Sequence, residues 1–134
     1  MRKRCNLFLI SLSLLACFTF SCAKHLNNPE PSERLVSYSL SSSNYQPFSD
    51  ITYINGDGAQ ASASAADSTS YWSTTVATSM NPFNAHMEVK GFNNTADTLR
   101  FTISIYLSGV LQASKQDSVL QFSTFDSEVA TVIQ

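Results

Sequence analysis

The side chains best suited to acid–base or metal chemistry stand at alternate positions of one segment, at His86, Glu88 and Lys90. Residues two apart on a strand face the same side, so His86 and Glu88 would lie together as metal ligands or as an acid–base pair. The only other histidine, His25, belongs to the first quarter of the chain. Opposite charges alternating along a solvated strand explain the same pattern without chemistry, and we favour that interpretation.

Other reactive constellations are missing from the sequence. Asp50, Asn55 and Asp57 offer oxygen ligands, but their spacing does not fit a twelve-residue calcium loop, and its closing glutamate is missing. No Gly-x-Ser-x-Gly segment is present, and a catalytic triad would have to use His86. The four glycines are too scattered for a phosphate-binding loop. The sequence therefore predicts a protein that is not an enzyme and that holds no metal or cofactor.

A binding site is a better prospect, because several apolar side chains stand in segments typical of loops. These are Tyr45, Phe48, Met80, Phe83 and Phe125. Exposed together at one end of the fold, they would form an apolar patch for a lipid or a partner protein. Buried, they would close the open ends of a core. The exposed fractions of these side chains decide between the two interpretations.

The first 21 residues have the pattern of an export signal. Arg2, Lys3 and Arg4 precede a run of 14 residues without charge, residues 7–20. A basic start followed by a short apolar run is typical of a signal peptide. The run is shorter than the roughly 20 residues that a membrane-spanning helix needs.

The end of this signal points to lipidation. Thr19-Phe20-Ser21-Cys22 resembles the lipobox of a bacterial lipoprotein, in a form found in the Bacteroidota. A competing frame, Leu14-Leu15-Ala16-Cys17, would place the lipid on Cys17. We prefer Cys22, because cleavage before Cys17 would leave Phe18 and Phe20 where a polar tether normally begins. Cys22 would then be the only mature cysteine, and since exported domains normally pair their cysteines, lipid attachment explains a single one.

We therefore expect a signal peptide at 1–21, the lipidated cysteine and a disordered tether at 22–34, and one folded domain at 35–134. Removing the signal leaves five basic residues (8 − 3) against ten acidic ones, a net charge of −5. An acidic domain is a poor ligand for nucleic acid. In the Bacteroidota lipoproteins that this signal resembles, surface export is associated with acidic residues directly after the lipidated cysteine. None follows Cys22, so the resemblance implies the periplasmic side of the outer membrane.

The folded domain has the composition of a sheet protein. Serine and threonine make up 33 of the 134 residues, and only 13% are charged. Period-two alternation predicts short strands, and Asn-Gly, Asp-Gly and Ser-Gly pairs predict tight turns between them. The predicted strands are 36–40, 50–55, 59–65, 71–78, 85–89, 99–107, 110–114, 119–125 and 128–133. Seven to nine short antiparallel strands favour an all-β, immunoglobulin-like β-sandwich, with Trp72 as its largest core side chain.

The order of these features resembles the C-terminal domain of the MmpS family. The likeness lies in Ile51-Thr52-Tyr53-Ile54-Asn55-Gly56, in Trp72-Ser73 and in the hairpin from Ile103 to Leu111. It implies an immunoglobulin-like sandwich and an accessory role beside an exporter of lipids or siderophores. The chain departs from the family in having a lipobox in place of a transmembrane helix, Ser108 where an aspartate is common, and a final strand without glycine.

Three sites have the form Asp-Ser/Thr-X, the pattern that Bacteroidota modify with O-glycans. Their acceptors are Ser68, Thr98 and Ser118. Asn93-Asn94-Thr95 fits the eukaryotic N-glycan pattern, to which we give no weight in a bacterial chain.

The sequence as a whole predicts a lipoprotein of the cell envelope whose β-sandwich binds an envelope protein or lipid without catalysis. The alternatives are a structural envelope lipoprotein with no specific ligand and an exporter accessory of the MmpS kind.

Overall fold

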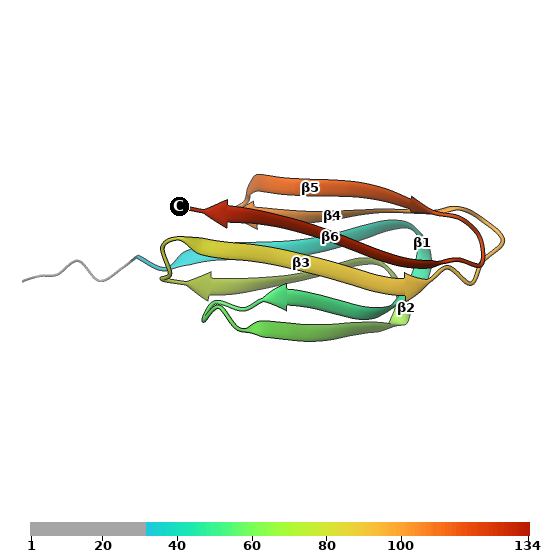
Figure 1. The fold of residues 1–134 in the computed structure, drawn as a ribbon, viewed down its shortest axis with the longest axis horizontal. Coiled ribbons are helices and arrows are strands. Elements are labelled where there is room, and N and C mark those ends of the chain that lie inside the picture. Colours follow the sequence, from blue (N-terminus) through green and yellow to red (C-terminus); the bar gives the residue numbers. More distant parts are fainter. Residues whose placement is uncertain (1–31) are drawn as a thin grey trace, which may run out of the picture. The chain divides into compact units, whose positions relative to one another are not determined.

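Strands form all the regular secondary structure in the described part of the chain. The computed structural model describes residues 32–134, except for the side chains of residues 44–47 and 64–69. Its strands, shown in Figure 1, are β1 (Arg34–Ile54), β2 (Gln60–Thr78), β3 (Phe83–Phe92), β4 (Leu99–Leu107), β5 (Val110–Val119) and β6 (Thr124–Ile133). Within these residues no helix is long and apolar enough to span a bilayer.

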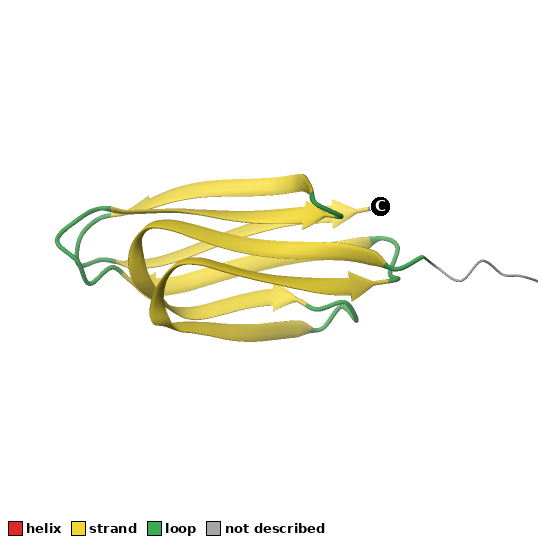
Figure 2. Cartoon of the chain, turned by 180° about the vertical axis from the view of Figure 1, so that it is seen from behind, coloured by secondary structure: helices red, strands yellow, loops and turns green. Residues whose placement is uncertain are grey.

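Two antiparallel sheets pack face to face because β1 and β2 run through both of them. Sheet I has the order β5, β4, first half of β1, second half of β2. Sheet II has the order β6, β3, second half of β1, first half of β2. The β1–β2 register shifts between Ser41 and Ile51, where the paired strands bend, and Figure 2 shows this folded ribbon from behind. Eight strand segments thus make a β-sandwich, as predicted. Its immunoglobulin-like subtype stays a prediction.

The two inner faces form one apolar core. Val36, Tyr38 and Leu40 of β1 alternate with exposed or half-buried serines, the pattern expected of a strand with one buried face. The largest fully buried side chains are Tyr38, Phe48 and Phe83. The prediction that Trp72 is the largest core side chain is wrong. Trp72 is only partly buried, because β2 pairs with β1 alone and its indole lies at the edge of the core against Tyr53.

The strand boundaries differ from the prediction at two places. The predicted strands 36–40 and 50–55 are one continuous strand, and so are 59–65 and 71–78, because β1 and β2 remain paired around the bend. The predicted strands 119–125 and 128–133 are wrong in their bounds. The chain turns at residues 120–123, and Thr124–Ile133 is a single strand whose partner is β3.

The hairpin turns fall where the sequence places them. In the β1–β2 turn, the Gly58 amide donates to the Asn55 carbonyl at 2.9 Å and the Asn55 amide to the Ala59 carbonyl at 2.8 Å. The positive φ of this turn is at Gly58, at 83°. The Asn55 carboxamide oxygen and the Asp57 carboxylate accept hydrogen bonds from the Gly56 and Ala59 amides, so their role is in the turn.

The connections collect at the two ends of the sandwich. The start of β1, the β1–β2 and β4–β5 turns and the end of β6 lie at one end (Figure 1), which we call the entry end. The β1–β2 bend and the β3–β4 and β5–β6 connections lie at the other, which we call the apex. The first strand, β1, begins at Arg34, and the boundaries of the signal, tether and domain stay predictions.

Candidate binding surfaces

The five apolar residues predicted from the sequence do not form one exposed patch. Phe48 and Phe83 are completely buried, and Phe125 is partly buried against the core. Phe83 pairs with Ile133 at the entry end, whereas Phe48 pairs with Gly91 near the apex. Met80 is exposed, and the side chain of Tyr45 lies outside the described residues. The prediction that these five residues form one exposed patch is therefore wrong.

Phe48, Phe101 and Phe125 instead close the core near the apex. Their ring centroids are 5.2–5.9 Å apart, and Phe48 meets the other two edge-on. Edge-to-face and tilted contacts at such distances are favourable beyond the area they bury. Gly91 leaves room for this cluster, since a Cβ there would lie 2.5 Å from the Phe125 ring.

A different apolar surface is exposed at the apex. Phe92 at the end of β3 is 45% exposed, and Leu120 and Phe122 in the β5–β6 connection are 70% and 62% exposed. We call these three residues the apex patch. They lie on neighbouring segments, because the Asn93 amide donates to the Ser123 carbonyl at 2.9 Å.

Asn93 fixes these two segments to each other. Its side chain is fully buried, and Nδ2 donates to the carbonyls of Asp97, Val119 and Leu120 at 2.8–3.2 Å. Its Oδ1 accepts from the amide and the hydroxyl of Thr95 at 3.2 and 2.8 Å. The Asn93-Asn94-Thr95 motif is thus a structural brace. A buried amide with both ends bonded holds the β3–β4 and β5–β6 connections in one geometry.

Phe122 has an unusual backbone for its residue type. Its φ is +54°, in the left-handed region that glycine adopts freely and a bulky residue adopts at a cost of about 1–2 kcal/mol. Strained residues of this kind gather at functional sites. Phe122 is therefore the strongest candidate for a binding residue at the apex, because its exposed ring lies on a strained turn that the buried Asn93 holds in place.

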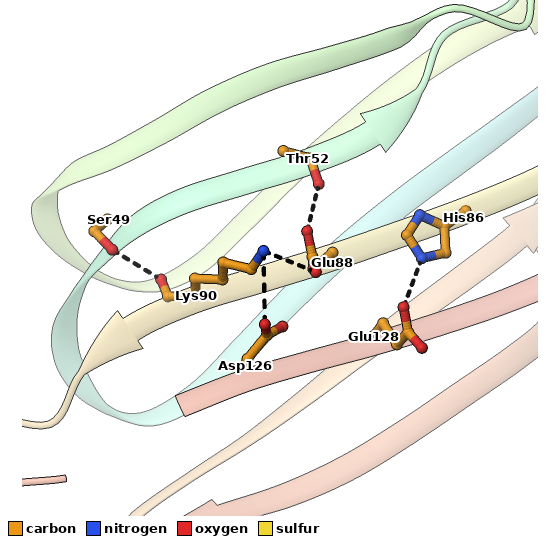
Figure 3. A network of polar contacts seen from close by, with 7 residues as sticks. All are labelled: Ser49, Thr52, His86, Glu88, Lys90, Asp126 and Glu128. Atoms are coloured by element: carbon orange, nitrogen blue, oxygen red, sulfur yellow. Dashed lines mark hydrogen bonds and ion pairs between the residues drawn. The ribbon is translucent and has the colours of Figure 1, made fainter. Parts of the chain in front are cut away.

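The outer face of sheet II carries the charged residues that the sequence singles out. Figure 3 shows His86, Glu88 and Lys90 on β3 beside Asp126 and Glu128 on β6. Lys90 Nζ lies 3.0 Å from Glu88 Oε1 and 3.6 Å from Asp126 Oδ2. His86 Nε2 lies 3.1 Å from Glu128 Oε2. The hydrogen bond from Lys90 to Glu88 and the charges of both carboxylates raise the pKa of Lys90.

These contacts fit the interpretation of a solvated charged strand face. Lys90 has a carboxylate partner on its own strand and one on the adjacent strand, and His86 lies beside a carboxylate of the adjacent strand, as is typical of cross-strand pairs. Further hydrogen bonds join the network to β1, from Thr52 Oγ1 to Glu88 at 3.4 Å and from Ser49 Oγ to the Lys90 carbonyl at 3.2 Å. Among the described residues no three His, Cys, Asp or Glu side chains are placed to share a metal ion.

The predicted modification sites fall into two groups. Thr98, which precedes β4, and Ser118 on β5 are exposed, so an enzyme that attaches a glycan can reach them. Ser68 lies in β2, but its side chain is outside the described residues, as are Cys17 and Cys22 altogether.

The apex patch is not among the sequence-based predictions, because those place Leu120 and Phe122 in a strand. Phe92 and Phe122 each stand beside turn-forming residues, in Phe92-Asn93-Asn94 and in Gln121-Phe122-Ser123. That signal favours exposure only once the turn between β5 and β6 is correctly placed.

Comparison with known proteins identifies no relative from which a function could be transferred. No protein-family model matches the chain, and no curated protein matches it at a significant level. The resemblance to the MmpS family stays a prediction.

Proposed function

We propose that this chain is a lipid-anchored protein of the cell envelope whose sandwich binds a partner protein, without catalysis, through the apex patch. The observation that carries the proposal is the exposed Phe92, Leu120 and Phe122 on two connections that the buried Asn93 holds together. Aromatic side chains are enriched at the centres of protein interfaces, and a preorganised backbone lowers the cost of binding.

The position of the patch favours a protein partner over the membrane that holds the anchor. Residues 23–33 link Cys22 to Arg34 at the entry end, and the patch lies at the opposite end of the sandwich. A nine-residue strand such as β4 spans about 30 Å. The chain therefore enters the sandwich at the end opposite the apex patch, which supports a protein partner for the patch.

The anchor is tested by labelling cells with radioactive palmitate. We expect the wild-type chain to be labelled and Cys22→Ala to be unlabelled. Label retained in Cys22→Ala and lost in Cys17→Ala would move the lipid to Cys17, and a wild-type chain without label would contradict the anchor.

The binding role is tested by titrating the tethered protein against solubilised envelope extract and quantifying what is recovered. Phe122→Gly and Leu120→Ser should each reduce recovery of a saturable partner roughly tenfold, in line with the loss of an interface anchor. Val110→Ser is the matched control, because it removes an equally exposed apolar side chain at the entry end. Recovery that is unsaturable, or equal in all four proteins, would favour the structural envelope lipoprotein instead.

Phe122→Gly has a second use in this experiment. Because glycine adopts a φ of +54° without strain, the variant should be as stable as the wild type or more so. A loss of binding in a protein of undiminished stability separates a lost contact from a damaged fold.

A further inference from the structure

A second surface, on the outer face of sheet I, has no part in the proposed interface. A groove of about 570 Å³ opens there beside the bend of β1 and spans β1, β4 and β5. The polar residues that line it include Ser41, Arg100, Thr102, Gln116, Asp117 and Ser118. Phe101 also borders the groove, but only 3% of it is exposed and its ring packs in the phenylalanine cluster of the core.

The lining groups are those that recognise sugar hydroxyls. Serine and threonine hydroxyls and the Gln116 amide both donate and accept, and the Arg100 guanidinium donates from a planar fork. They stand in cross-strand rows, with Thr102 opposite Ser41 and Gln116, and Arg100 opposite Ser118. Such rows match a chain of sugar rings, which presents hydroxyl groups at regular intervals.

Arg100 supplies the positive charge of the groove. At the outward-facing positions of sheet I that the structure describes, it is the one charged side chain, and no carboxylate of the described residues pairs with it. Asp117 is engaged elsewhere, accepting from the Ser118 amide at 2.8 Å and lying 3.9 Å from Lys115 Nζ. A ligand carboxylate would satisfy the Arg100 fork with charge-assisted hydrogen bonds.

An exposed aromatic residue lies on the strand next to the groove-lining Ser41. Tyr71 on β2 is the cross-strand partner of Ser41 and is 60% exposed. An exposed aromatic ring at such a position can cover the apolar face of a sugar ring. The backbone beneath is fixed, since the Arg100 amide donates to Ser43 Oγ at 3.2 Å and Ser104 and Ser114 hydroxyls bond at 3.0 Å.

From these groups we infer that the groove binds an acidic oligosaccharide, with Arg100 on a sugar carboxylate, the hydroxyl rows on neighbouring sugar hydroxyls and Tyr71 against a ring face. The site is separate from the apex patch and does not depend on the partner proposed there. A glycan attached to Ser118 would occupy the groove, so modification of Ser118 and binding of a free oligosaccharide exclude each other.

The test is a calorimetric titration with a panel of uronic-acid oligosaccharides and their methyl esters. The protein is the full lipidated chain in detergent micelles, and its mass is measured first to verify that it carries no glycan. We expect saturable binding of an acidic member and at least tenfold weaker binding of its ester. Arg100→Gln should cause a similar loss, because charge-assisted hydrogen bonds are among the strongest a side chain makes. Tyr71→Ser should weaken binding several-fold.

Lys90→Gln is the matched control, since it removes one positive charge from the outer face of the other sheet. Its affinity should equal that of the wild type. Equal affinity for acid and ester, an Arg100→Gln variant that binds like the wild type, or a wild type that binds no member of the panel would overturn the inference.

Discussion

At the scale of single residues, the apex depends on two side chains whose environments contradict their usual preferences. Asparagine is normally exposed, yet Asn93 is fully buried and bonded at both ends of its amide. Phenylalanine is normally buried, yet Phe122 is mostly exposed on a left-handed backbone. The buried amide maintains the loop geometry, and that geometry keeps the aromatic ring in solvent.

Unlike Asn93, Ser127 is a buried polar residue whose side chain makes no hydrogen bond with the described residues. It lies on the core side of β6 opposite Val89, it is 1% exposed, and its hydroxyl has no hydrogen-bond partner among the described residues. An unsatisfied buried hydroxyl costs about 1–3 kcal/mol. We therefore expect Ser127→Ala to raise the free energy of unfolding by about 1 kcal/mol.

Urea denaturation measures this change. The control is Ser73→Ala on the exposed face of β2, which should alter the free energy of unfolding by less than about 0.5 kcal/mol. A Ser127→Ala variant less stable than the wild type would show that the hydroxyl has a partner after all.

At the scale of the elements, the β1–β2 turn is packed against the end of β2. A Cβ on Gly56 would lie 1.8 Å from the carbonyl oxygen of Ala77, a backbone atom that cannot rotate away. Gly56→Ala should therefore lower the free energy of unfolding by roughly 2–3 kcal/mol.

Gly109 supplies the comparison for Gly56 in another hairpin turn. A Cβ on Gly109 would meet no atom within 4 Å, but the φ there is 83°, so Gly109→Ala should cost only about 1 kcal/mol of backbone strain. Thermal unfolding of both variants separates the two causes. Equal losses would show that steric contact with Ala77 is not what requires glycine at position 56.

The charged face of sheet II depends on a lysine between carboxylates. Glu88 and Glu128 are direct cross-strand partners, an arrangement that is repulsive by itself. Lys90 contacts Glu88 and Asp126, and His86 contacts Glu128. Lys90→Met should destabilise the domain at low salt, and added salt should then stabilise the variant relative to the wild type by screening the remaining repulsion.

Urea midpoints at low and high sodium chloride measure this difference. Lys115→Met is the control, because it removes an isolated contact with Asp117 outside the network. If Lys90→Met and Lys115→Met respond to salt alike, the carboxylates of sheet II do not interact strongly enough to matter.

At the scale of the whole molecule, the sequence predicts the sandwich better than its connections. The strict alternation of Leu99–Leu107 predicts β4 with its observed bounds, because one buried face imposes period two. Residues 41–47 have the serine and asparagine content of a loop, yet they continue β1. Pairing with β2 carries the strand around the bend, and such long-range pairing leaves no local signal.

For the surfaces too, local contacts can be predicted from the sequence and contacts between distant segments cannot. The pairing of Glu88 with Lys90 is local and could be read from the sequence. The apex patch and the groove each join segments far apart in the chain, as Phe92 with Phe122 or Ser41 with Gln116. Their assembly depends on the register of neighbouring strands, which alternation alone does not specify.

The buried Tyr38 links the whole fold to pH. Its hydroxyl donates to the Ile54 carbonyl at 2.8 Å, which joins the two halves of β1 across the core. Burial raises the pKa of Tyr38 above its usual value of about 10. Above about pH 10 the phenol therefore loses its proton more readily in the unfolded chain than in the folded one. Stability is then complete below pH 10 and falls as pH rises, by about 1.4 kcal/mol per pH unit from this group.

Tyr38→Phe removes that titration and also leaves the Ile54 carbonyl without its donor. We expect the variant to be about 1–2 kcal/mol less stable than the wild type at pH 8. Between pH 10 and 12 its free energy of unfolding should fall less steeply, so that the two curves converge. Urea denaturation at pH 8, 10, 11 and 12 measures both quantities. Parallel curves over this range would mean that Tyr38 ionises alike in the folded and unfolded chains, and that the hydroxyl stabilises the fold only through its hydrogen bond.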